Sequence, residues 1–137
     1  MRIVQHSVFL PAEPAKVYEM YLDPLKHAAF TGGGEVQIAP LEGALFSAFG
    51  GRIHGRILSL IPGRQIAQTW RSFEWLPGDP DSLLLLTFEP EFGGTRLELL
   101  QAPVPEHLHA KLQENWPMRY FEPWLAALGG NQDKPDM

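Results

Sequence analysis

The sequence predicts an α+β domain in which a curved antiparallel sheet of about seven strands wraps around a long C-terminal helix, with two short helices after the first strand. Residues 35–101 alternate short apolar runs with turn signals, a pattern typical of an antiparallel meander. Residues 14–30 and 108–128 carry apolar side chains at helical spacing. A long helix with a broad aromatic face needs a sheet to cover it, so one curved sheet around that helix accounts for both patterns.

The N-terminal part is expected to form a strand and then two short helices. The strand covers residues 2–10, RIVQHSVFL, which are rich in apolar and β-branched side chains and end at Pro11. Pro14 suits the first turn of a helix, and apolar residues follow it at helical spacing. Asp23-Pro24 has the pattern of an N-cap followed by proline at the first helical position, which opens a second helix through about Phe30.

Three consecutive glycines, Gly32–Gly34, follow the second helix. A phosphate cradle would place such glycines before a helix N-terminus, where backbone N–H groups and the helix dipole face the anion. Here the helix comes first and a strand follows, and the GxxxxGK[ST] pattern is missing from the sequence. The glycines are therefore expected to end the helix and lead into the next strand; a mobile lip over a pocket is the alternative.

Six further strands are expected in the middle of the chain, joined mostly by tight turns. The strand segments are EVQIAP, ALFSAFGG, RIHGRILSLIPG, RQIAQTWRSFEWLPGDPD, SLLLLTFEPEFGG and TRLELLQAP. The segments on either side of Phe92-Gly93-Gly94 give the clearest hairpin signal.

The C-terminal helix is predicted from a repeat of four residues. Its apolar face consists of Leu108, Leu112, Trp116, Tyr120 and Trp124. Pro117 lies inside this helix and should kink it or start a new turn, because proline removes one backbone donor. Gly129-Gly130 is expected to end the helix, which leaves residues 1–128 as a single domain and residues 129–137 as a flexible tail.

Several stretches resemble the START-like superfamily, also called SRPBCC or Bet v-like, and within it the AHSA-type branch named after the activator of the heat-shock-protein ATPase. The matching stretches are SVFLPAEPAKVYEMYLDP, HAAFTG, GALFSAFGGRIHGRILSLIPGRQIAQTWR, the hairpin from SLLLLTFEP to GGTRLELLQAPVP, and NWPMRYFEPWLAAL. Together they extend from about His6 to Leu128. The resemblance implies a helix-grip fold (β-α-α-β6-α) with an internal, mostly apolar cavity. It leaves activity open, because members range from lipid and hormone carriers to polyketide cyclases.

Composition excludes several function classes. The net charge is −5, and the 11 Lys and Arg residues are scattered without a basic run, so no nucleic-acid partner is expected. The absence of cysteine excludes disulfides and thiol chemistry. No stretch approaches the roughly 20 apolar residues needed to span a bilayer, and no signal peptide is recognised, so a cytoplasmic location is expected.

Catalytic and metal-binding patterns are weak. His107 and His109 are two residues apart, which does not place them on one helix face, and His54 should point away from the core. His27 is expected near the mouth of the cavity. No serine lies in a GxSxG-like turn, and the carboxylates are dispersed. Catalytic residues, metal ligands and cofactors are therefore not assigned.

Aromatic residues are the strongest candidates for a binding site. The expected lining of a cavity for an apolar or amphipathic small molecule is Phe30, Phe46, Phe49, Trp70, Arg71, Trp116 and Tyr120. Arg71 and Gln101 would supply polar groups to this cavity. The alternative is that these aromatic residues form a packed core without a cavity. We therefore expect non-catalytic ligand binding. The alternatives are a chaperone co-factor or stress-response interaction protein, and a cavity enzyme of the cyclase or hydrolase type.

The stretch SLLLLTF predicts a partner surface. Leu84, Leu86 and Phe88 would share one face of the strand, and Leu83 and Leu85 the other. The face away from the helix should be solvated in a fold with one sheet, so leucines there indicate a contact surface. A homodimer through this outer face is expected.

Overall fold

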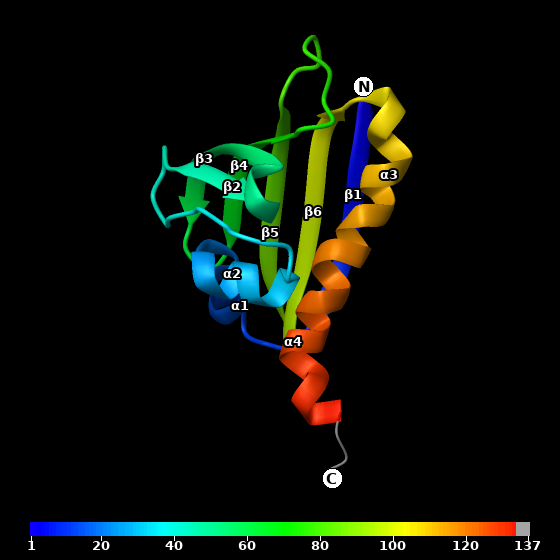
Figure 1. Ribbon diagram of the computed structural model, residues 1–137. Coiled ribbons are helices and arrows are strands. Elements are labelled where there is room, and N and C mark those ends of the chain that lie inside the picture. Colours follow the sequence, from blue (N-terminus) through cyan, green and yellow to red (C-terminus); the bar gives the residue numbers. More distant parts are fainter. Residues whose placement is uncertain (134–137) are drawn as a thin grey trace.

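The computed structural model describes residues 1–133 and contains one antiparallel sheet with the strand order β1-β6-β5-β4-β3-β2 (Figure 1). The strands are β1 Arg2–Leu10, β2 Leu45–Ala48, β3 Ile53–Ile61, β4 Gln65–Ser72, β5 Ser82–Glu91 and β6 Gly94–Val104. The helices are α1 Pro14–Leu22, α2 Pro24–Thr31, α3 His109–Trp116 and α4 Glu122–Asp133. The helices α3 and α4 run along the β1–β6 side, and α1 and α2 lie beside the lower end of the sheet (Figure 1).

The sheet buries every second side chain against the helices, as its pleat requires. Gln68, Leu84, Gln101 and Val4 are opposite one another on four adjacent strands, and all four are fully buried. The predicted hairpin is confirmed: in β5 and β6, residues from Leu83 to Glu91 pair with residues from Ala102 back to Gly94, around the two-residue connection Phe92-Gly93. The division of the leucine run between two faces is confirmed as well.

The second N-terminal helix is capped as the sequence predicts. The Asp23 side chain accepts hydrogen bonds from the backbone N–H groups of Leu25 and Lys26, at 2.9 and 3.0 Å, and Pro24 follows it. Gly32 ends α2 in the left-handed conformation with φ 65°, which glycine adopts without steric cost. The glycine run is therefore a helix terminator, as expected.

The next two glycines allow a close approach between two segments. A Cβ on Gly33 would lie 2.1 Å from ring carbons of Phe49, and the N–H of Gly50 donates to the carbonyl of Glu35 at 3.1 Å. The residues after α2 therefore pack directly on the 3-10 turn Phe49–Gly51 between β2 and β3. Phe49 itself has φ 54°, an unusual conformation for a residue with a side chain.

The prediction of seven strands is wrong by one. Residues 35–40 form no strand, because only Gln37 pairs, through two backbone hydrogen bonds with Ser47 of 2.9 and 2.8 Å. Gly34 precedes this bridge with φ 114°, and Pro40 after it has no N–H to donate. Val36 and Ile38 nevertheless bury their side chains, which explains the alternation that resembled a strand.

The C-terminal helix changes its winding at Pro117, in agreement with the prediction of a new turn. Pro117–Phe121 form a π-helical turn, closed by a hydrogen bond from the N–H of Glu122 to the carbonyl of Pro117. The predicted end at Gly129-Gly130 is wrong, since α4 continues to Asp133. Gly129 stays helical instead of taking the left-handed conformation that terminates α2. The predicted tail thus starts inside the helix, and its last residues, 134–137, lie outside the described residues.

Candidate functional site

The space between the sheet and the helices has two parts, and the part beneath α1 and α2 is filled by rings. Phe30 stacks on Trp124 with ring centroids 4.5 Å apart, and Phe46 stacks on Tyr21 at 6.2 Å. The His27 ring lies 5.4 Å from Tyr120 in an edge-on arrangement. All five aromatic residues and His27 are buried. We call this part the closed half.

A chain of hydrogen bonds crosses the closed half. His27 Nδ1 is 2.8 Å from the backbone oxygen of Tyr21, which can only accept, so Nδ1 carries the proton. His27 Nε2 then accepts from the hydroxyl of Tyr120 at 2.8 Å. The Tyr21 hydroxyl donates to Gln68 Oε1 at 2.5 Å. Every polar atom of the His27 ring is therefore satisfied within the core.

Burial determines how these groups titrate. Desolvation lowers the pKa of His27 to about 4, and the hydrogen bond to Tyr21 opposes this only in part. Desolvation also raises the pKa values of Tyr21 and Tyr120 above their ordinary range. The network is neutral near pH 7, so it stabilises the core and offers no charged acid or base.

The second part of the interior opens to solvent as a pocket of about 180 Å³ between the ends of β3 and β4 and the C-terminal helix. It is lined by Phe49, Arg52, Ile53, Trp70, Ser72, Phe73, Glu74, Lys111, Leu112, Asn115, Trp116, Arg119 and Tyr120. Its floor is aromatic: Trp116 lies 5.7 Å from Trp70 and 4.9 Å from Tyr120, ring to ring. We call these thirteen residues the rim pocket.

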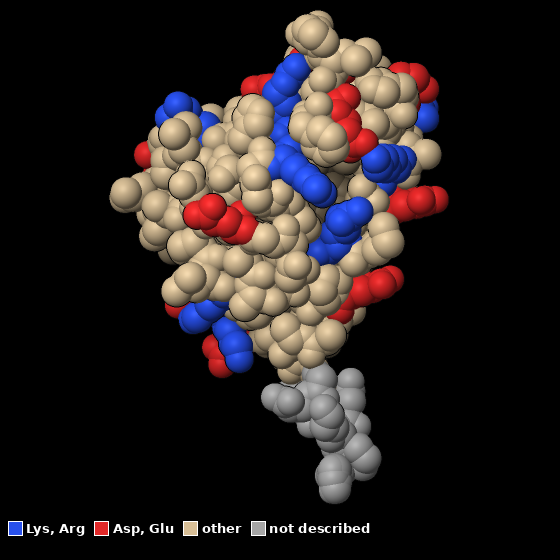
Figure 2. Space-filling view, in the orientation of Figure 1, with Lys and Arg blue, Asp and Glu red and all other residues tan. Residues whose placement is uncertain are grey.

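The rim pocket is locally basic although the whole chain is acidic. Three cations line it, Arg52, Lys111 and Arg119, against one carboxylate, Glu74. Lys111 donates a hydrogen bond to Glu74, whereas neither arginine has a carboxylate partner among the side chains that the structure describes, those of residues 1–129. Figure 2 shows Lys and Arg side chains gathered around a hollow over the seam between the sheet and the C-terminal helix.

Two buried N–H donors near the pocket have no partner among the described residues. The indole nitrogen of Trp116 donates to Gln101 Oε1 at 2.9 Å, but Gln101 Nε2 is left unpaired. The indole nitrogen of Trp70 is also unpaired. Unpaired buried donors are costly, so each marks a place where an acceptor would stabilise the protein.

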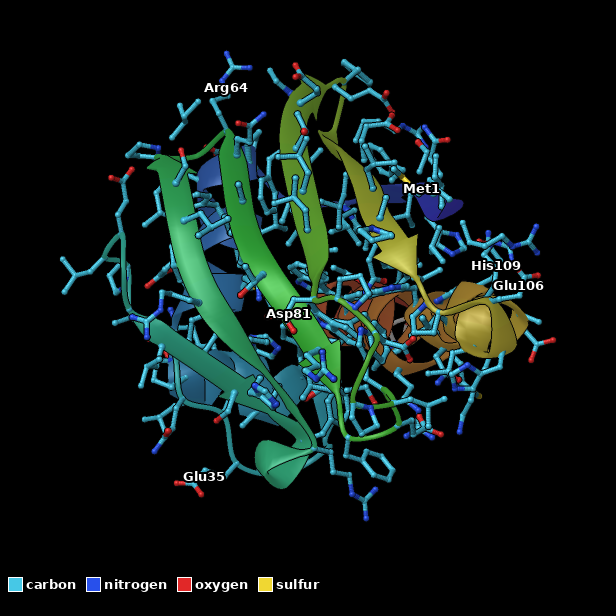
Figure 3. The ribbon with its side chains drawn as sticks, turned by 90° about the horizontal axis from the view of Figure 1, so that it is seen from above. Met1, Glu35, Arg64, Asp81, Glu106 and His109 are labelled. Atoms are coloured by element: carbon cyan, nitrogen blue, oxygen red, sulfur yellow. The ribbon has the colours of Figure 1, made fainter. Side chains whose placement is uncertain are left out.

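One wall of the rim pocket continues into the loop after β4, which Arg71 holds in shape. Arg71 donates to the carbonyl oxygens of Asp79 and Leu76, at 2.6 and 2.9 Å, and to the carboxylate of Asp81 at 3.0 Å. The indole nitrogen of Trp75 donates to the Pro80 carbonyl at 3.0 Å. Figure 3 shows Asp81 at the base of this loop.

The expected lining residues divide between the two halves. Phe49, Trp70, Trp116 and Tyr120 line the rim pocket. Phe30 and Phe46 lie in the closed half, in contact with other rings. Arg71 does not line the pocket: it follows Trp70 in a strand, so it points to the other face and binds the loop.

The histidines also differ from expectation in part. His54 is exposed, as predicted, whereas His27 lies in the core and not at a mouth. Within residues 1–133, no group of three potential metal ligands comes together. A cavity enzyme needs a titratable side chain that faces the pocket. Of His27, His54, Arg71 and Glu74, only Glu74 is part of the lining, and Lys111 binds it.

Sequence reasoning missed the two arginines that line the rim pocket and the buried polar network. Arg52 follows a glycine turn and Arg119 lies in the π-helical turn, and neither position has a motif around it. The hydrogen-bonded pair Tyr21 and Gln68 is separated by 47 residues, so only the fold brings it together. The described helices include none long and apolar enough to cross a membrane.

Comparison with known proteins gives both sequence relatives and structural neighbours. The chain is 33% identical over 104 residues to an activator of 90 kDa heat shock protein ATPase homolog from Dictyostelium discoideum, covering 75% of this chain and 27% of the relative. It spans between 27% and 37% of the length of the curated relatives that it matches.

Solved structures share the fold. An HSP90 activator from Plasmodium falciparum superposes with a TM-score of 0.86 at 17% identity, over 94% of this chain and 97% of that chain. The Aha1 dimer from Colwellia psychrerythraea gives 0.77 at 14% identity, over 93% and 96% of the two chains. The family model described as "Activator of Hsp90 ATPase homolog 1-like protein" matches residues 11–123. This chain is therefore a member of that AHSA-type family, with a helix-grip fold.

Proposed function

We propose that this domain acts by protein contact, as an interaction partner of an Hsp90-class ATPase. The observation that carries the proposal is the filled interior of the closed half, where stacked rings occupy the place of a large internal cavity. The rim pocket, at about 180 Å³, is smaller than the roughly 300–1,000 Å³ of usual ligand sites. Recognition by the outer surface fits such an interior better than carriage of a lipid.

An exposed apolar surface supports the proposal. Leu85 lies opposite Ala67 on β4 and Leu100 on β6, on the sheet face away from the helices. Leu83 and Leu100 expose 48% and 38% of their surface, on neighbouring strands of that face. Contiguous apolar surface of this kind marks contact sites on many proteins. We call Ala67, Leu83, Leu85 and Leu100 the outer-face patch.

The relatives support the choice of partner. The curated relative from Dictyostelium discoideum is described as an activator of the 90 kDa heat shock protein ATPase, and the solved Plasmodium falciparum chain as an HSP90 activator. The domain covers 97% of that solved chain, which has a similar size.

The test is the ATPase rate of the Hsp90-class protein from the same organism, measured while the domain is added in increasing molar excess. We expect a saturable change in turnover and a complex in analytical ultracentrifugation. The double variant Leu83→Glu/Leu100→Glu should abolish both, because it places charges in the outer-face patch. Phe92→Glu, at the exposed tip of the β5–β6 hairpin, is the matched control. The absence of a complex and of any change in turnover with the unaltered domain would overturn the proposal.

The same outer-face patch is the place where we propose self-association. The Colwellia psychrerythraea neighbour is described as a dimer, and exposed leucines lie on this face of the present chain. Light scattering should give twice the monomer mass of 15.4 kDa, and Leu83→Glu should return the protein to that mass. A monomer at all concentrations would refute the dimer without affecting the chaperone proposal.

A second proposed function is binding of a small amphipathic molecule in the rim pocket. The aromatic floor of Trp70, Trp116 and Tyr120 beside charged groups is the specific observation that favours it. Compounds of one or two rings should shift the indole N–H signals of Trp70 and Trp116 in NMR spectra. The Trp124 signal, from the closed half, serves as the internal control. Shifts in none of these signals, or equal shifts in all, would contradict binding in this pocket.

A further inference from the structure

We propose that the rim pocket selects an anionic aromatic ligand, namely a planar carboxylic acid of one or two rings, through Arg52 and Arg119. This inference rests on the second function proposed above and adds the charge, the shape and the selecting residues. Two properties of the pocket carry it: the cationic, donor-rich character of its lining, and its aromatic floor and size.

The charge of the lining favours an anion. Arg52 and Arg119 line the pocket, and neither has a carboxylate within ion-pair distance among the side chains of residues 1–129. Glu74, the one acidic residue of the lining, is bound to Lys111. The chain as a whole carries a net charge of −5, so these unpaired cations run against the average of the protein. Guanidinium groups bind carboxylates with paired, charge-assisted hydrogen bonds.

The hydrogen-bonding groups of the lining are mostly donors. The Trp70 ring lines the pocket, but its indole N–H is buried and adds no accessible donor. Arg52, Lys111 and Arg119 can only donate. The Tyr120 hydroxyl already gives its proton to His27. A ligand rich in acceptors, such as a carboxylate, complements this set, whereas a donor-rich amine does not.

The body of the ligand follows from the floor and the volume. The rings of Trp70, Trp116 and Tyr120 form an apolar floor that suits stacking or edge contacts with a flat ring. An apolar cavity of about 150 Å³ is large enough for benzene. At about 180 Å³ and with an open mouth, the rim pocket accommodates one or two rings, and a long acyl chain exceeds it.

A matched pair of ligands tests the inference: 2-naphthoate and its neutral amide, 2-naphthamide. Both have the same fused rings, and only the first has a charge. Calorimetric titration should give an affinity for the acid about tenfold higher than for the amide, because guanidinium groups form charge-assisted hydrogen bonds with the carboxylate and weaker ones with the neutral amide. Added NaCl should narrow this difference, because the arginines are exposed.

The selecting residues are tested by the double variant Arg52→Gln/Arg119→Gln, which should bind acid and amide equally. Arg64→Gln is the control, because Arg64 is exposed and lies in the β3–β4 turn. This turn is at the opposite end of β3 from the Phe49–Gly51 turn (Figure 3). The indole N–H signal of Trp70, assigned with Trp70→Phe, should shift when the acid is added. Circular dichroism of each variant checks that it remains folded.

The outcomes separate this inference from the function on which it rests. Equal binding of acid and amide by the unaltered protein, with shifts of Trp70, would overturn charge selection and leave the ligand pocket standing. Binding of neither compound would overturn both. Preference for the acid that survives in the double arginine variant would place the anion elsewhere and also overturn the inference.

Discussion

The closed half and the rim pocket lie under the same sheet and against the same C-terminal helix, yet they differ in how completely they are filled. In the closed half, Phe30, Phe46 and Trp124 pack ring on ring, and His27 has both ring nitrogens bonded. In the rim pocket, the rings of Trp70 and Trp116 line open space. An unpaired indole N–H occurs in both parts among the described residues, at Trp70 and at Trp124.

The difference arises from what covers each end of the sheet. The helices α1 and α2 bring Tyr21, His27 and Phe30 into the closed half, so their side chains complete the core. At the other end, the cover consists of the Phe49–Gly51 turn and the loop after β4, which supply fewer buried side chains. The comparison teaches that short helices over one end of the sheet complete a packed core, whereas the end without them keeps an open pocket.

The largest expected effect is loss of stability in the closed half. Trp124→Ala removes a buried indole that stacks on Phe30, and we expect the free energy of unfolding to fall by about 3–5 kcal/mol, the range for such truncations. Urea denaturation measures this. Phe92→Ala, at a fully exposed position, should change stability by less than about 0.5 kcal/mol. A loss below about 1 kcal/mol for Trp124→Ala would show that the closed half is less tightly packed than we describe.

The next effect is a dependence of the free energy of unfolding on pH, through His27 in the closed half. The pKa of His27 is about 4 in the folded protein and 6.5 in an unfolded chain, so between these values only the unfolded chain binds the proton. The free energy of unfolding should therefore decrease by about 3 kcal/mol as the pH falls from about 6.5 to 4. Denaturation at several pH values measures the slope. His27→Gln retains one donor and one acceptor and should flatten it; an unchanged slope in that variant would assign the effect to other groups.

The smallest effect concerns the boundary between the two halves. Gly33→Ala would place a Cβ against the Phe49 ring, which also contacts Tyr120 at 5.7 Å, so we expect a loss of about 1–3 kcal/mol. In a Phe49→Ala background the same change should cost less than about 0.5 kcal/mol, because the ring is gone. A double-mutant cycle measures this coupling. Equal costs in both backgrounds would mean that Gly33 does not position Phe49.

Much of the fold follows from local sequence signals. Asp23-Pro24 capped α2, Gly32 ended it, and Pro117 began a new turn, each by local backbone chemistry. The prediction of a strand at residues 35–40 was wrong. The alternation of apolar and polar residues there reflects the buried side chains of Val36 and Ile38, and the segment has only an isolated bridge to Ser47. The predicted end of α4 was wrong, because a glycine such as Gly129 can adopt the left-handed conformation but is equally able to stay helical.

The site was less predictable from the sequence, because it depends on the register of the strands and on which elements cover each end of the sheet. Trp70 and Arg71 are adjacent in one strand, so strand alternation alone excludes both from facing one pocket, and only Trp70 does. Phe30 and Trp116 are both buried aromatic residues near the ends of helices, α2 and α3, and the position of each helix under the sheet places one in the closed half and the other at the rim pocket. The arginines of the rim reach it from a glycine turn and a π-helical turn, which carry no recognisable motif.

The π-helical turn has a consequence for how this sequence tolerates length changes. A side chain repeated every four residues drifts about 40° per step around an ordinary α-helix, so from Leu112 to Trp124 the drift would reach about 120°. The wide turn at Pro117–Phe121 takes up part of this rotation, and Trp116, Tyr120 and Trp124 all stay buried. Removal of one residue from this turn would restore regular α-helical winding and leave Leu112 and Trp124 within about 20° of one another around the helix axis, so Trp124 should stay buried. Removal of one residue from the regular part of the helix would instead rotate everything after it by about 100°, so a single-residue deletion should be tolerated better within Pro117–Phe121 than before it.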